Sequence, residues 1–403
     1  MSKLEQLIQQ YCPDGVEYSL IGSIAQVGTG SSNGNEADED GQYPFFVRSQ
    51  TIKRKNDYEY DEEAIIIPGE GGIGDIFHYV NGKYALHQRV YRIHFTTPDV
   101  NAKFAFYYMK SAFKQFIMMK AVSATVTSIR KPMIEDFSIP VPPLPVQEEI
   151  VRILDTFTEL QAELQAELQK RLQQYNYYRD NLLSFKDINR GGQVGDIEWK
   201  TLGELGIFYG GLSGKTKDDF KDGNAKFITY KNIYSNIALD IHTNDMVKIA
   251  EGEKQNTIQY GDVLFTGSSE TPDECGISSV LTEHTDERLY LNSFCFGYRL
   301  NDKTKYLPDF LKHLFRCGQL RAQIGKTASG TTRFNVSKKR FAEVKIPIIP
   351  IYEQKRIATI LDHFDSLTND LTAGLPAEIE KRKQQYEFYR DKLLSFKRID
   401  QYV

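Results

Sequence analysis

Several short motifs have the residue types of catalytic sites, but each lacks a residue that its chemistry requires. Gly325-Lys326-Thr327 resembles the end of a phosphate-binding loop, GxxxxGK[ST], whose backbone amides and lysine hold nucleotide phosphates. The first glycine of that loop would stand at position 320, which is Leu320. The sequence therefore does not predict an NTPase site.

Signatures of methyl transfer, cleavage and metal binding are incomplete as well. Amino-methyltransferases carry [Asp/Asn/Ser]-Pro-Pro-aromatic, whereas the adjacent prolines here stand in the stretch VPPL at 141–144. Pro308-Asp309 with the EVK at 343–345 fits a nuclease PD…ExK pattern only superficially, and we interpret Val344 as part of a strand. The histidines lack metal-ligand spacing such as HExxH. We expect no catalytic residue and no metal site in this chain.

The composition is typical of a globular protein with more than one domain. A domain usually has ~100–200 residues, so a chain of 403 predicts two to four folding units. The hydrophobic fraction of 40% and the aromatic fraction of 12% exclude a disordered chain. No apolar run approaches the roughly 18 residues that span a bilayer, and a cytoplasmic location is expected. The net charge of −4 excludes a uniformly basic surface but allows a local basic face.

The four cysteines give no indication of a disulfide framework. Cys12, Cys275, Cys295 and Cys317 show no CxxC pairing and are sparse for a chain of this length. Buried, reduced thiols are therefore expected.

The chain is a tandem duplication. IPVPPLPVQEEIVRILDTF from Ile139 returns as IPIIPIYEQKRIATILDHF from Ile346, at an offset of 207 residues and without a gap. KRLQQYNYYRDNLLSFK from Lys170 returns as KRKQQYEFYRDKLLSFK from Lys381, at an offset of 211, and the openings of the two copies match at an offset of 181. Each copy thus has a matching opening, a divergent middle and a matching helical end. A period near 200 residues is too long for a solenoid, whose repeats have ~20–50 residues.

A heptad pattern follows each proline cluster. In the first copy the pattern occupies Ile150, Leu154, Phe157, Gln161, Leu164, Leu168, Arg171, Tyr175, Tyr178, Leu182 and Phe185. Alternating steps of four and three predict the a/d seam of a coiled coil, and about 40 helical residues would form a rod of roughly 60 Å. The second copy repeats the pattern but is interrupted at 374–376, where Gly-Leu-Pro predicts a kink.

The two helical ends could bury their seams against each other. Antiparallel packing would place one globular domain at each end, with a pseudo-twofold axis between them, whereas two unrelated surface helices are the alternative. Within the first helix, a four-residue unit, Thr/Ala-Glu-Leu-Gln, recurs three times over 158–169, and we call each unit a tetrad. Each tetrad turns a helix by about 400° and lengthens it by ~6 Å, although generic helical filler would read the same way.

These repeated blocks resemble the specificity subunits of type I restriction–modification systems. The resemblance is carried by the proline run followed by QEEI at 147–150, by its counterpart YEQKRI at 352–357, and by the twin helix ends YYRDNLLSF at 177–185 and FYRDKLLSF at 388–396. The tetrads resemble the variable spacer of that family. The resemblance covers essentially the whole chain.

The resemblance implies an α+β fold, with two globular target-recognition domains joined by two long antiparallel coiled-coil helices in a pseudo-twofold tandem repeat. The domains are expected at 1–144 and 191–350, and the helices at 145–190 and 351–403. It also implies a non-catalytic DNA-binding subunit, in which each domain reads half of a bipartite asymmetric site and the helices set the gap and dock methyltransferase subunits. The implied partners are double-stranded DNA, two methyltransferase subunits and, in complexes that cleave, two endonuclease subunits. S-adenosylmethionine, ATP and Mg²⁺ are expected only on those partners.

The candidate DNA-contacting residues follow from chemistry, because the divergent middles carry no motif to transfer. Phosphates need cations and backbone donors, whereas bases need arginine, amides or hydroxyls in a groove. In the first domain the candidates are Thr29, Ser31, Arg48, Gln50, Lys53, Arg54, Lys55, Gln88, Arg89, Thr125, Thr127, Arg130 and Lys131. In the second they are Lys215, Lys217, Tyr230, Lys231, Asn232, Ser268, Ser269, Thr331, Thr332, Arg333, Asn335 and Lys338.

The strongest internal signal among these candidates is a pair of aligned segments. Residues 125–131 align at an offset of 207 with residues 332–338, so both copies place a Thr/Ser-rich, cationic loop immediately before the terminal strand. For each other candidate a solvated surface loop is the alternative, and the glycines at 69–74 are equally typical of a tight turn.

Partner docking is expected on the matching helix ends. The candidates are Tyr177, Tyr178, Arg179, Tyr389 and Arg390, which recur in both copies as binding of two identical partners requires. For Tyr178 and Tyr389, the inner tyrosines of the two helix ends, the alternative is a place in the coiled-coil seam. For the whole chain, the alternative is a coiled-coil adaptor whose duplicated domains bind proteins without DNA specificity, but an adaptor does not explain two unlike middles between like helices.

Overall fold

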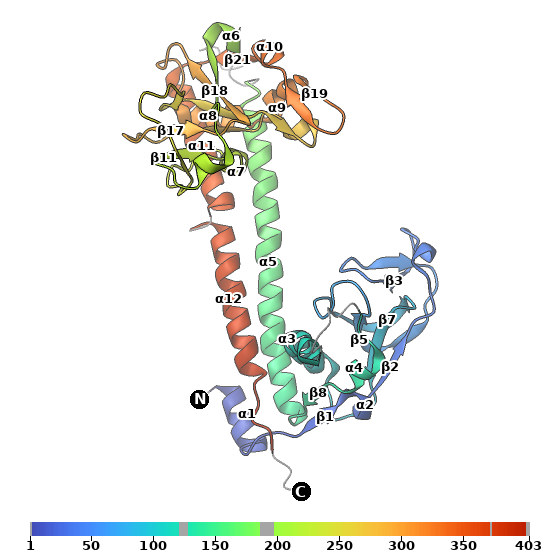
Figure 1. Ribbon diagram of the computed structural model, residues 1–403. Helices are drawn as coiled ribbons and strands as arrows, with labels where there is room; N and C mark the ends of the chain where they lie inside the picture. The colour runs from blue at the N-terminus through green and yellow to red at the C-terminus, as the bar shows by residue number, and fades with distance from the viewer. Residues whose placement is uncertain (1, 121–127, 186–196, 371–372, 400–403) are drawn as a thin grey trace. The chain divides into compact units, whose positions relative to one another are not determined.

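The computed structural model describes residues 2–120, 128–185, 197–370 and 373–399, and the chain forms two compact units (Figure 1). Unit 1 is Met1–Gln165 together with Ile379–Val403, and unit 2 is Ala166–Glu378. Each unit therefore takes its globular part from one copy of the repeat and its helical segments from both copies. Both units combine β-sheets with helices, which confirms the predicted α+β fold.

Unit 1 is built on a six-stranded sheet of order β2-β7-β5-β6-β3-β4, in which β3 runs parallel to β6 and the other neighbours are antiparallel. The buried run from Ala64 to Pro68 makes β5 the central strand. Ile65 and Ile67 pack in one apolar cluster with Met109 and Phe113 of α3. The elements are α1 (Lys3–Tyr11), β1 (Tyr18–Leu20), α2 (Ile21–Ile24), β2 (Ala25–Thr29), β3 (Tyr43–Phe46), β4 (Lys53–Lys55), β5 (Tyr60–Pro68), β6 (His78–Leu86), β7 (Val90–Phe95), α3 (Ala102–Lys120), α4 (Lys131–Glu135) and β8 (Ser138–Pro140).

Unit 2 divides its strands among smaller sheets. Two four-stranded sheets have the orders β10-β18-β14-β16 and β12-β11-β17-β13, and β11 runs parallel to β17 in the second. Phe265, Phe296 and Phe341 form the centre of the largest apolar cluster. The elements are β9 (Glu198–Thr201), α6 (Leu202–Leu205), β10 (Gly206–Gly210), β11 (Ala225–Ile228), α7 (Tyr230–Ser235), β12 (Met246–Val247), β13 (Thr257–Ile258), β14 (Val263–Thr266), β15 (Ser268–Ser269), β16 (Ser278–Val280), β17 (Leu289–Leu291), β18 (Cys295–Leu300), α8 (Pro308–Leu314), α9 (Gly318–Gly325), β19 (Ala328–Ser329), β20 (Phe334–Val336), α10 (Lys338–Phe341), β21 (Lys345–Ile348) and α11 (Ile351–Asn369).

The duplication seen in the sequence recurs in the strand register. The opening and the end of each globular part form a short antiparallel pair, β1 with β8 in unit 1 and β9 with β21 in unit 2. Tyr18 lies opposite Pro140, and Trp199 lies opposite Pro347. These are the positions that the sequence offsets of 181 and 207 make equivalent.

A buried glutamine ties each globular part to the helix that follows it. Gln147 in α5 (Leu144–Leu182) and Gln354 in α11 are fully buried, and each side-chain amide makes three hydrogen bonds to backbone groups. The partners of Gln147 are the carbonyls of Asp99 and Pro142 and the amide of Asn101; those of Gln354 are the carbonyls of Lys305 and Ile349 and the amide of Leu307. The repeat therefore reproduces the same side-chain bridge.

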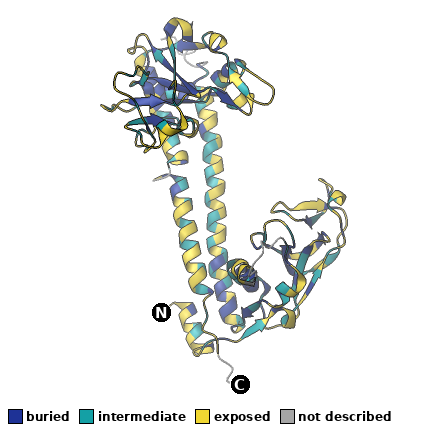
Figure 2. Ribbon diagram, in the orientation of Figure 1, coloured by how far each residue is buried: buried dark blue, intermediate teal, exposed yellow. Residues whose placement is uncertain are grey.

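Helices from the two copies pack on each other inside each unit. In unit 1, Phe157 of α5 stacks on Tyr389 of α12 (Leu375–Leu393), with ring centroids 5.6 Å apart. In unit 2, Tyr178 of α5 stacks on Phe364 of α11, at 5.2 Å. Gly374 immediately precedes α12, and α11 ends at Asn369. Figure 2 shows buried residues concentrated in the globular part of each unit and exposed residues along α5 and α12.

The cysteines are buried and unpaired, as expected. Among the described residues, none of the helices is both long and apolar enough to cross a membrane. The same part of the chain holds no group of three or more His, Cys, Asp or Glu side chains that could bind a metal ion.

Candidate nucleic-acid interface

In unit 1, the turn between β6 and β7 presents Arg89 to solvent. The amide of His87 donates to the carbonyl of Phe46 at 3.0 Å, and the amide of Val90 donates to the carbonyl of His87 at 2.9 Å. The Nδ1 atom of His87 accepts from the amide of Arg89 at 3.0 Å, which fixes the turn. The side chain of Arg89 is 55% exposed.

In unit 2, the turn between β17 and β18 has the same hydrogen bonds with different side chains. The amide of Asn292 donates to the carbonyl of Ile228 at 3.0 Å, and the amide of Cys295 donates to the carbonyl of Asn292 at 3.0 Å. The Oδ1 atom of Asn292 accepts from the amide of Phe294 at 2.9 Å. Asn292 therefore takes the place of His87, and Phe294, 62% exposed, takes the place of Arg89.

A glycine joins this turn to a third segment in each unit. The amide of Gly69 donates to the carbonyl of Arg89 at 2.9 Å, and its carbonyl accepts from the amide of Ile129 at 2.7 Å. In unit 2, the amide of Gly267 donates to the carbonyl of Phe294 at 2.9 Å, and its carbonyl accepts from the amide of Val336 at 3.0 Å.

Close approach of the backbones explains the glycines. A Cβ atom on Gly267 would lie 2.6 Å from the carbonyl oxygen of Phe294, and one on Gly69 would lie 3.1 Å from that of Arg89. We call these three joined segments the frame. The side chains around it are rim 1 (Arg48, Glu70, Gln88, Arg89 and Arg130) and rim 2 (Tyr230, Lys231, Ser268, Phe294 and Arg333).

Rim 1 is a cluster of cations around one carboxylate. Glu70 accepts hydrogen bonds at 2.9 Å from Arg48 and at 2.9 Å from Arg89, and these bonds hold the pKa of Glu70 below its usual value. Burial and the neighbouring arginines lower the pKa of His87, which keeps the imidazole neutral at pH 7. Arg130 follows directly on the frame segment at Ile129 and is exposed. Rim 1 thus offers guanidinium groups in the geometry that phosphates and guanine bind.

Rim 2 surrounds a hollow of about 610 Å³ with aromatic and hydroxyl groups. The hydroxyl of Tyr230 donates to the carbonyl of Ser268 at 2.8 Å, and Nε of Arg333 donates to Oγ of Ser268 at 3.2 Å. Tyr234 stacks on Tyr230 and donates to Glu274, and this hydrogen bond lowers the pKa of that carboxyl. The hollow is lined by Tyr230, Lys231, Tyr234, Ser268, Ser269, Glu270, Glu274, Phe294, Thr332 and Arg333.

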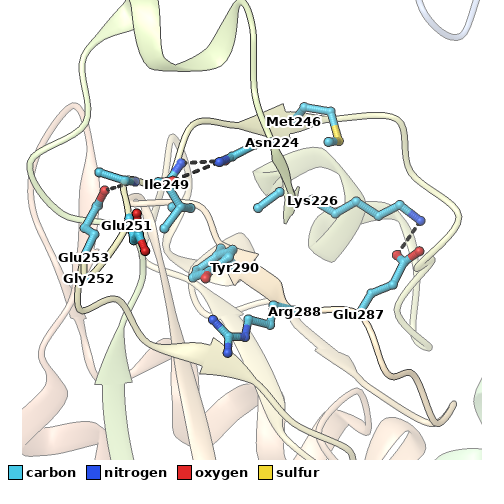
Figure 3. A pocket seen from close by; sticks show the side chains of 12 residues that line it. Asn224, Lys226, Met246, Ile249, Glu251, Gly252, Glu253, Glu287, Arg288 and Tyr290 are labelled. Atoms are coloured by element: carbon cyan, nitrogen blue, oxygen red, sulfur yellow. Dashed lines mark hydrogen bonds and ion pairs between the residues drawn. The ribbon is translucent and has the colours of Figure 1, made fainter.

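A larger hollow in unit 2 does not fit a nucleic acid. It opens at the other ends of β11 and β17, and Figure 3 shows Lys226 turned toward Glu287, with which it pairs at 2.6 Å. Glu251 and Glu253 also line it. The lining of this hollow has three carboxylates against two cations, Lys226 and Arg288, whereas the hollow of rim 2 has two of each, so we place the candidate interface at the rims.

Four predicted cations and amides have structural roles instead. Lys55 is 9% exposed and binds Ser32 and Glu36, and Arg54 donates to the carbonyls of Gly41 and Gln42. The side chain of Lys215, 9% exposed, pairs with Glu253, and Asn232 bonds to the backbone of Asp240. These four stabilise loops within their own units.

The other candidates are distributed as follows. Thr29, Ser31, Gln50, Lys53 and Lys217 are exposed but outside the rims, Ser269 lines the hollow of unit 2, and Thr125 and Thr127 lie outside the described residues. Lys131 pairs with Glu135, and Thr331, Thr332 and Asn335 lie on the exposed hairpin of β19 and β20. Lys338 is exposed, with its ammonium 5.7 Å from the ring centroid of Phe296.

Two sequence-based interpretations of this region are wrong in detail. The segment 332–338 is not a loop immediately before the terminal strand, because 334–336 forms β20, which pairs with β15 and β19. A short helix, α4 or α10, then precedes the terminal strand in each unit, and Pro132 in the first turn of α4 favours its start. Val344 precedes β21 rather than belonging to it.

The helix ends carry matching aromatic patches. In unit 2, Tyr177 is 66% exposed and lies beside Tyr178, which is 38% exposed. In unit 1, Phe388 is 64% exposed and lies beside Tyr389, which is also 38% exposed. Each inner tyrosine stacks on the phenylalanine that the other copy supplies.

Arg179 and Arg390 are placed differently from these tyrosines. Their side chains are only 15% and 22% exposed, they pair with Asp180 and Asp391, and they lie over the rings of Tyr175 and Tyr386. A change at either arginine would therefore disturb the fold of its own unit.

The sequence did not single out Glu70, Phe294 or Phe388. Phe388 could have been found, because it aligns with Tyr177 at the offset of 211. Glu70 and Phe294 had no comparable signal, since an acidic and an apolar side chain do not suggest DNA contact until the frame places them on a rim.

Comparison with known proteins identifies the class. The family described as "Type I restriction modification DNA specificity domain" matches residues 13–174 and 195–381, so the chain belongs to this family. A type I restriction enzyme specificity subunit of Escherichia coli is 36% identical over 264 residues, a stretch that spans 63% of this chain and 60% of that protein.

Solved structures share the fold along nearly the whole chain. The type I restriction–modification S subunit of M. genitalium gives a TM-score of 0.56 at 15% identity, covering 95% of this chain and 97% of that one. A chain from a study of complex assembly and conformational transition of the type I R-M system gives 0.58 at 15% identity, covering 95% and 98%.

Proposed function

We propose that this chain is the DNA-reading subunit of a type I restriction–modification complex and that each unit binds one half of a bipartite asymmetric site. The observation that carries this proposal is the shared frame with unlike rims. The frame is held by backbone hydrogen bonds, which do not depend on side-chain identity, so its rim residues can differ without loss of fold. Two readers on the same frame with different side chains are what two different half-sites require.

The spacing between the half-sites is assigned to α5. This helix is continuous over 39 residues and includes the Glu-Leu-Gln tetrads at 158–169. Because an α-helix is a stiff element with a fixed rise per residue, its length can determine the separation of two bound half-sites.

The aromatic patches at the helix ends are assigned to docking of two methyltransferase subunits. Equivalent patches on both units fit two copies of one partner, and exposed aromatic side chains are enriched at protein interfaces. Endonuclease subunits would join in complexes that cleave, and S-adenosylmethionine, ATP and Mg²⁺ would bind to the partners. A solved chain with the same fold comes from a study of complex assembly in the type I R-M system, which supports the assignment of the patches to docking.

A selection from random double-stranded DNA tests DNA reading. The full chain, alone and with its methyltransferase partner, is incubated with a random duplex library, and bound duplexes are sequenced over several rounds. We expect enrichment of two unlike half-sites at a fixed separation. Absence of any enriched motif in the presence of the partner would reject the proposal and favour a protein-binding adaptor.

Docking is tested with Tyr177→Ala and Phe388→Ala, singly and together. Because both rings are mostly exposed, each variant should fold normally, each single variant should retain one methyltransferase, and the double variant should retain none. Tyr58→Ala, at a tyrosine 43% exposed in the first globular part, is the matched control. Full retention of two partners by the double variant, measured as the mass of the purified complex, would contradict the assignment.

A further inference from the structure

We propose that one position of the frame, Arg89 in unit 1 and Phe294 in unit 2, reads a base in each half-site, guanine in the first and thymine in the second. This inference rests on the proposed function and adds the base class to it. It assigns opposite chemistry to two residues that are separated in sequence but equivalent in structure.

The equivalence of the two positions depends on five matching hydrogen bonds. In each unit, the residue two positions earlier, His87 or Asn292, donates its backbone amide to the last residue of a parallel strand. A side-chain atom of that residue accepts the amide of Arg89 or Phe294. Its carbonyl accepts the amide of the residue after Arg89 or Phe294, which closes the turn. The carbonyl of Arg89 or Phe294 accepts from the amide of the frame glycine, and the carbonyl of that glycine accepts from an amide in the segment before a short helix. Arg89 and Phe294 are therefore held by the same backbone in both readers.

Both side chains project from their turns toward solvent. Arg89 is 55% exposed and Phe294 is 62% exposed, although an exposed phenylalanine loses the stabilisation that burial would give it. Cations lie on the same rims: Arg48 shares Glu70 with Arg89, Arg130 is exposed and follows the frame segment at Ile129, and Lys231 and Arg333 line the hollow with Phe294. Phosphate contacts from these cations would bring the turn against base edges in a groove.

The guanidinium of Arg89 is oriented for a bidentate contact. Its Nη1 atom donates to both carboxylate oxygens of Glu70, while Nε and Nη2 make no hydrogen bond within the described part of the chain. Those two nitrogens form one planar edge with parallel N–H groups, and that edge matches O6 and N7 of guanine in the major groove. Glu70 holds the group in place, so less side-chain entropy is lost on binding.

Phe294 has no hydrogen-bonding group and cannot read guanine in this way. An exposed aromatic ring among hydroxyls and cations suits the 5-methyl group of thymine, the apolar feature of the major groove. Glu270 and Glu274 line the same hollow as Lys231 and Arg333; because the carboxylates repel phosphates, contacts to the DNA backbone are left to the two cations.

The test uses base analogues that remove one atom group each. After selection has given the half-sites, every thymine of the half-site read by unit 2 is replaced in turn by deoxyuridine, which lacks only the methyl group. Every guanine of the other half-site is replaced in turn by 7-deazaguanine, which lacks the N7 acceptor. Affinities are measured with the full chain in complex with its methyltransferase.

For the wild-type chain, we expect a loss of about 4-fold at one thymine, the value of one buried methyl group, and of about 10-fold at one guanine. Phe294→Ala should bind the thymine and uracil duplexes equally. Arg89→Met, which keeps the length of the side chain but has no hydrogen-bond donor, should bind the guanine and 7-deazaguanine duplexes equally. Ile207→Ala, at another exposed apolar residue of unit 2, should retain both discriminations.

Full discrimination by Phe294→Ala or by Arg89→Met would overturn the inference, as would half-sites that lack thymine or guanine. Loss of methyltransferase from Phe294→Ala with an unchanged DNA motif would show that the ring binds protein instead. A selection that yields no motif at all would instead reject the proposed function, so the two failures are distinguishable.

Discussion

Rim 1 and rim 2 surround the same backbone frame with different chemistry. In unit 1 the turn carries Arg89, held with Arg48 on Glu70, whereas in unit 2 the same turn carries Phe294 beside Tyr230 and Ser268. The frame itself consists of backbone hydrogen bonds and a glycine in each unit. The comparison teaches that the same backbone frame can be kept within one chain while the side chains around it differ.

The largest expected effect tests whether the two copies of the repeat are equivalent at their buried glutamines. Gln147→Leu and Gln354→Leu each remove three hydrogen bonds, one buried and two partly buried, and leave the backbone groups without these partners. Each unpaired group costs about 1–3 kcal/mol, and we expect each variant to lose about 3 kcal/mol of unfolding free energy. Urea denaturation would measure it, and a large loss in one variant with none in the other would break the equivalence of the two copies.

The frame glycines should differ in sensitivity. Gly267→Ala places a Cβ atom 2.6 Å from a backbone oxygen, whereas Gly69→Ala places it at 3.1 Å. We expect a loss of about 2 kcal/mol of unfolding free energy in the first and about 1 kcal/mol in the second, because a rigid carbonyl must move further in unit 2. Each variant should also weaken only its own half-site in a binding assay. Equal tolerance of alanine at both glycines would show that the backbones do not approach each other closely.

The two units should differ in their sensitivity to acid, because α5 and α11 each carry a carboxylate with a lowered pKa. In unit 1, hydrogen bonds from Arg152 at 2.7 Å and from Lys3 at 2.8 Å lower the pKa of Glu149 to about 2. In unit 2, Arg356 lowers the pKa of Glu353. A carboxyl whose folded-state pKa is depressed stabilises the fold above its unfolded pKa, and this contribution is lost as the pH falls from about 4.5 to about 2.

The contribution of Glu149 should be about 1 kcal/mol, since both of its cationic partners are mostly exposed. Glu149→Gln should therefore lower stability at pH 7 and reduce the further loss between pH 5 and pH 3 in urea denaturation. Glu353→Gln, with one partner fewer, should have the smaller effect. Identical pH profiles of Glu149→Gln and the wild-type chain would contradict the assigned pKa.

The smallest effect concerns Arg130 of rim 1 and the adjacent Lys131. Replacing Arg130 and Lys131 together by alanine should weaken binding to the first half-site about 3-fold and make the dependence of log K on log salt shallower by about 1 for each phosphate that is no longer bound. Lys338→Ala in unit 2 is the counterpart and should affect only the second half-site. Unchanged affinity at two salt concentrations would exclude phosphate binding by Arg130 and Lys131.

The duplication could be predicted from sequence because identities at fixed offsets survive in its openings and helix ends. Tyr18 aligns with Trp199 and Gln147 with Gln354, and the strand register and hydrogen bonds of each pair agree with that alignment. These residues match because each packs or bonds in the same way twice.

The frame could not be predicted. Gly69 and Gly267 stand at a separation that differs from every offset of the repeat, because loops of different length precede them. Backbone hydrogen bonds leave no trace in side-chain identity, which hid the equivalence of Arg89 and Phe294. Sequence likewise could not separate exposed cations from paired ones such as Lys55 and Lys215.

The independence of the two readers is tested most directly by deleting Ala162–Gln165 from α5 and determining the selected or methylated motif. Deleting one tetrad shortens the helix by ~6 Å and leaves its ends rotated relative to each other by about 40°, which is close to the roughly 36° turn of one base-pair step of B-DNA. The account predicts two unchanged half-sites with the gap shortened by about one base pair. An unchanged gap, or altered bases in either half-site, would contradict it.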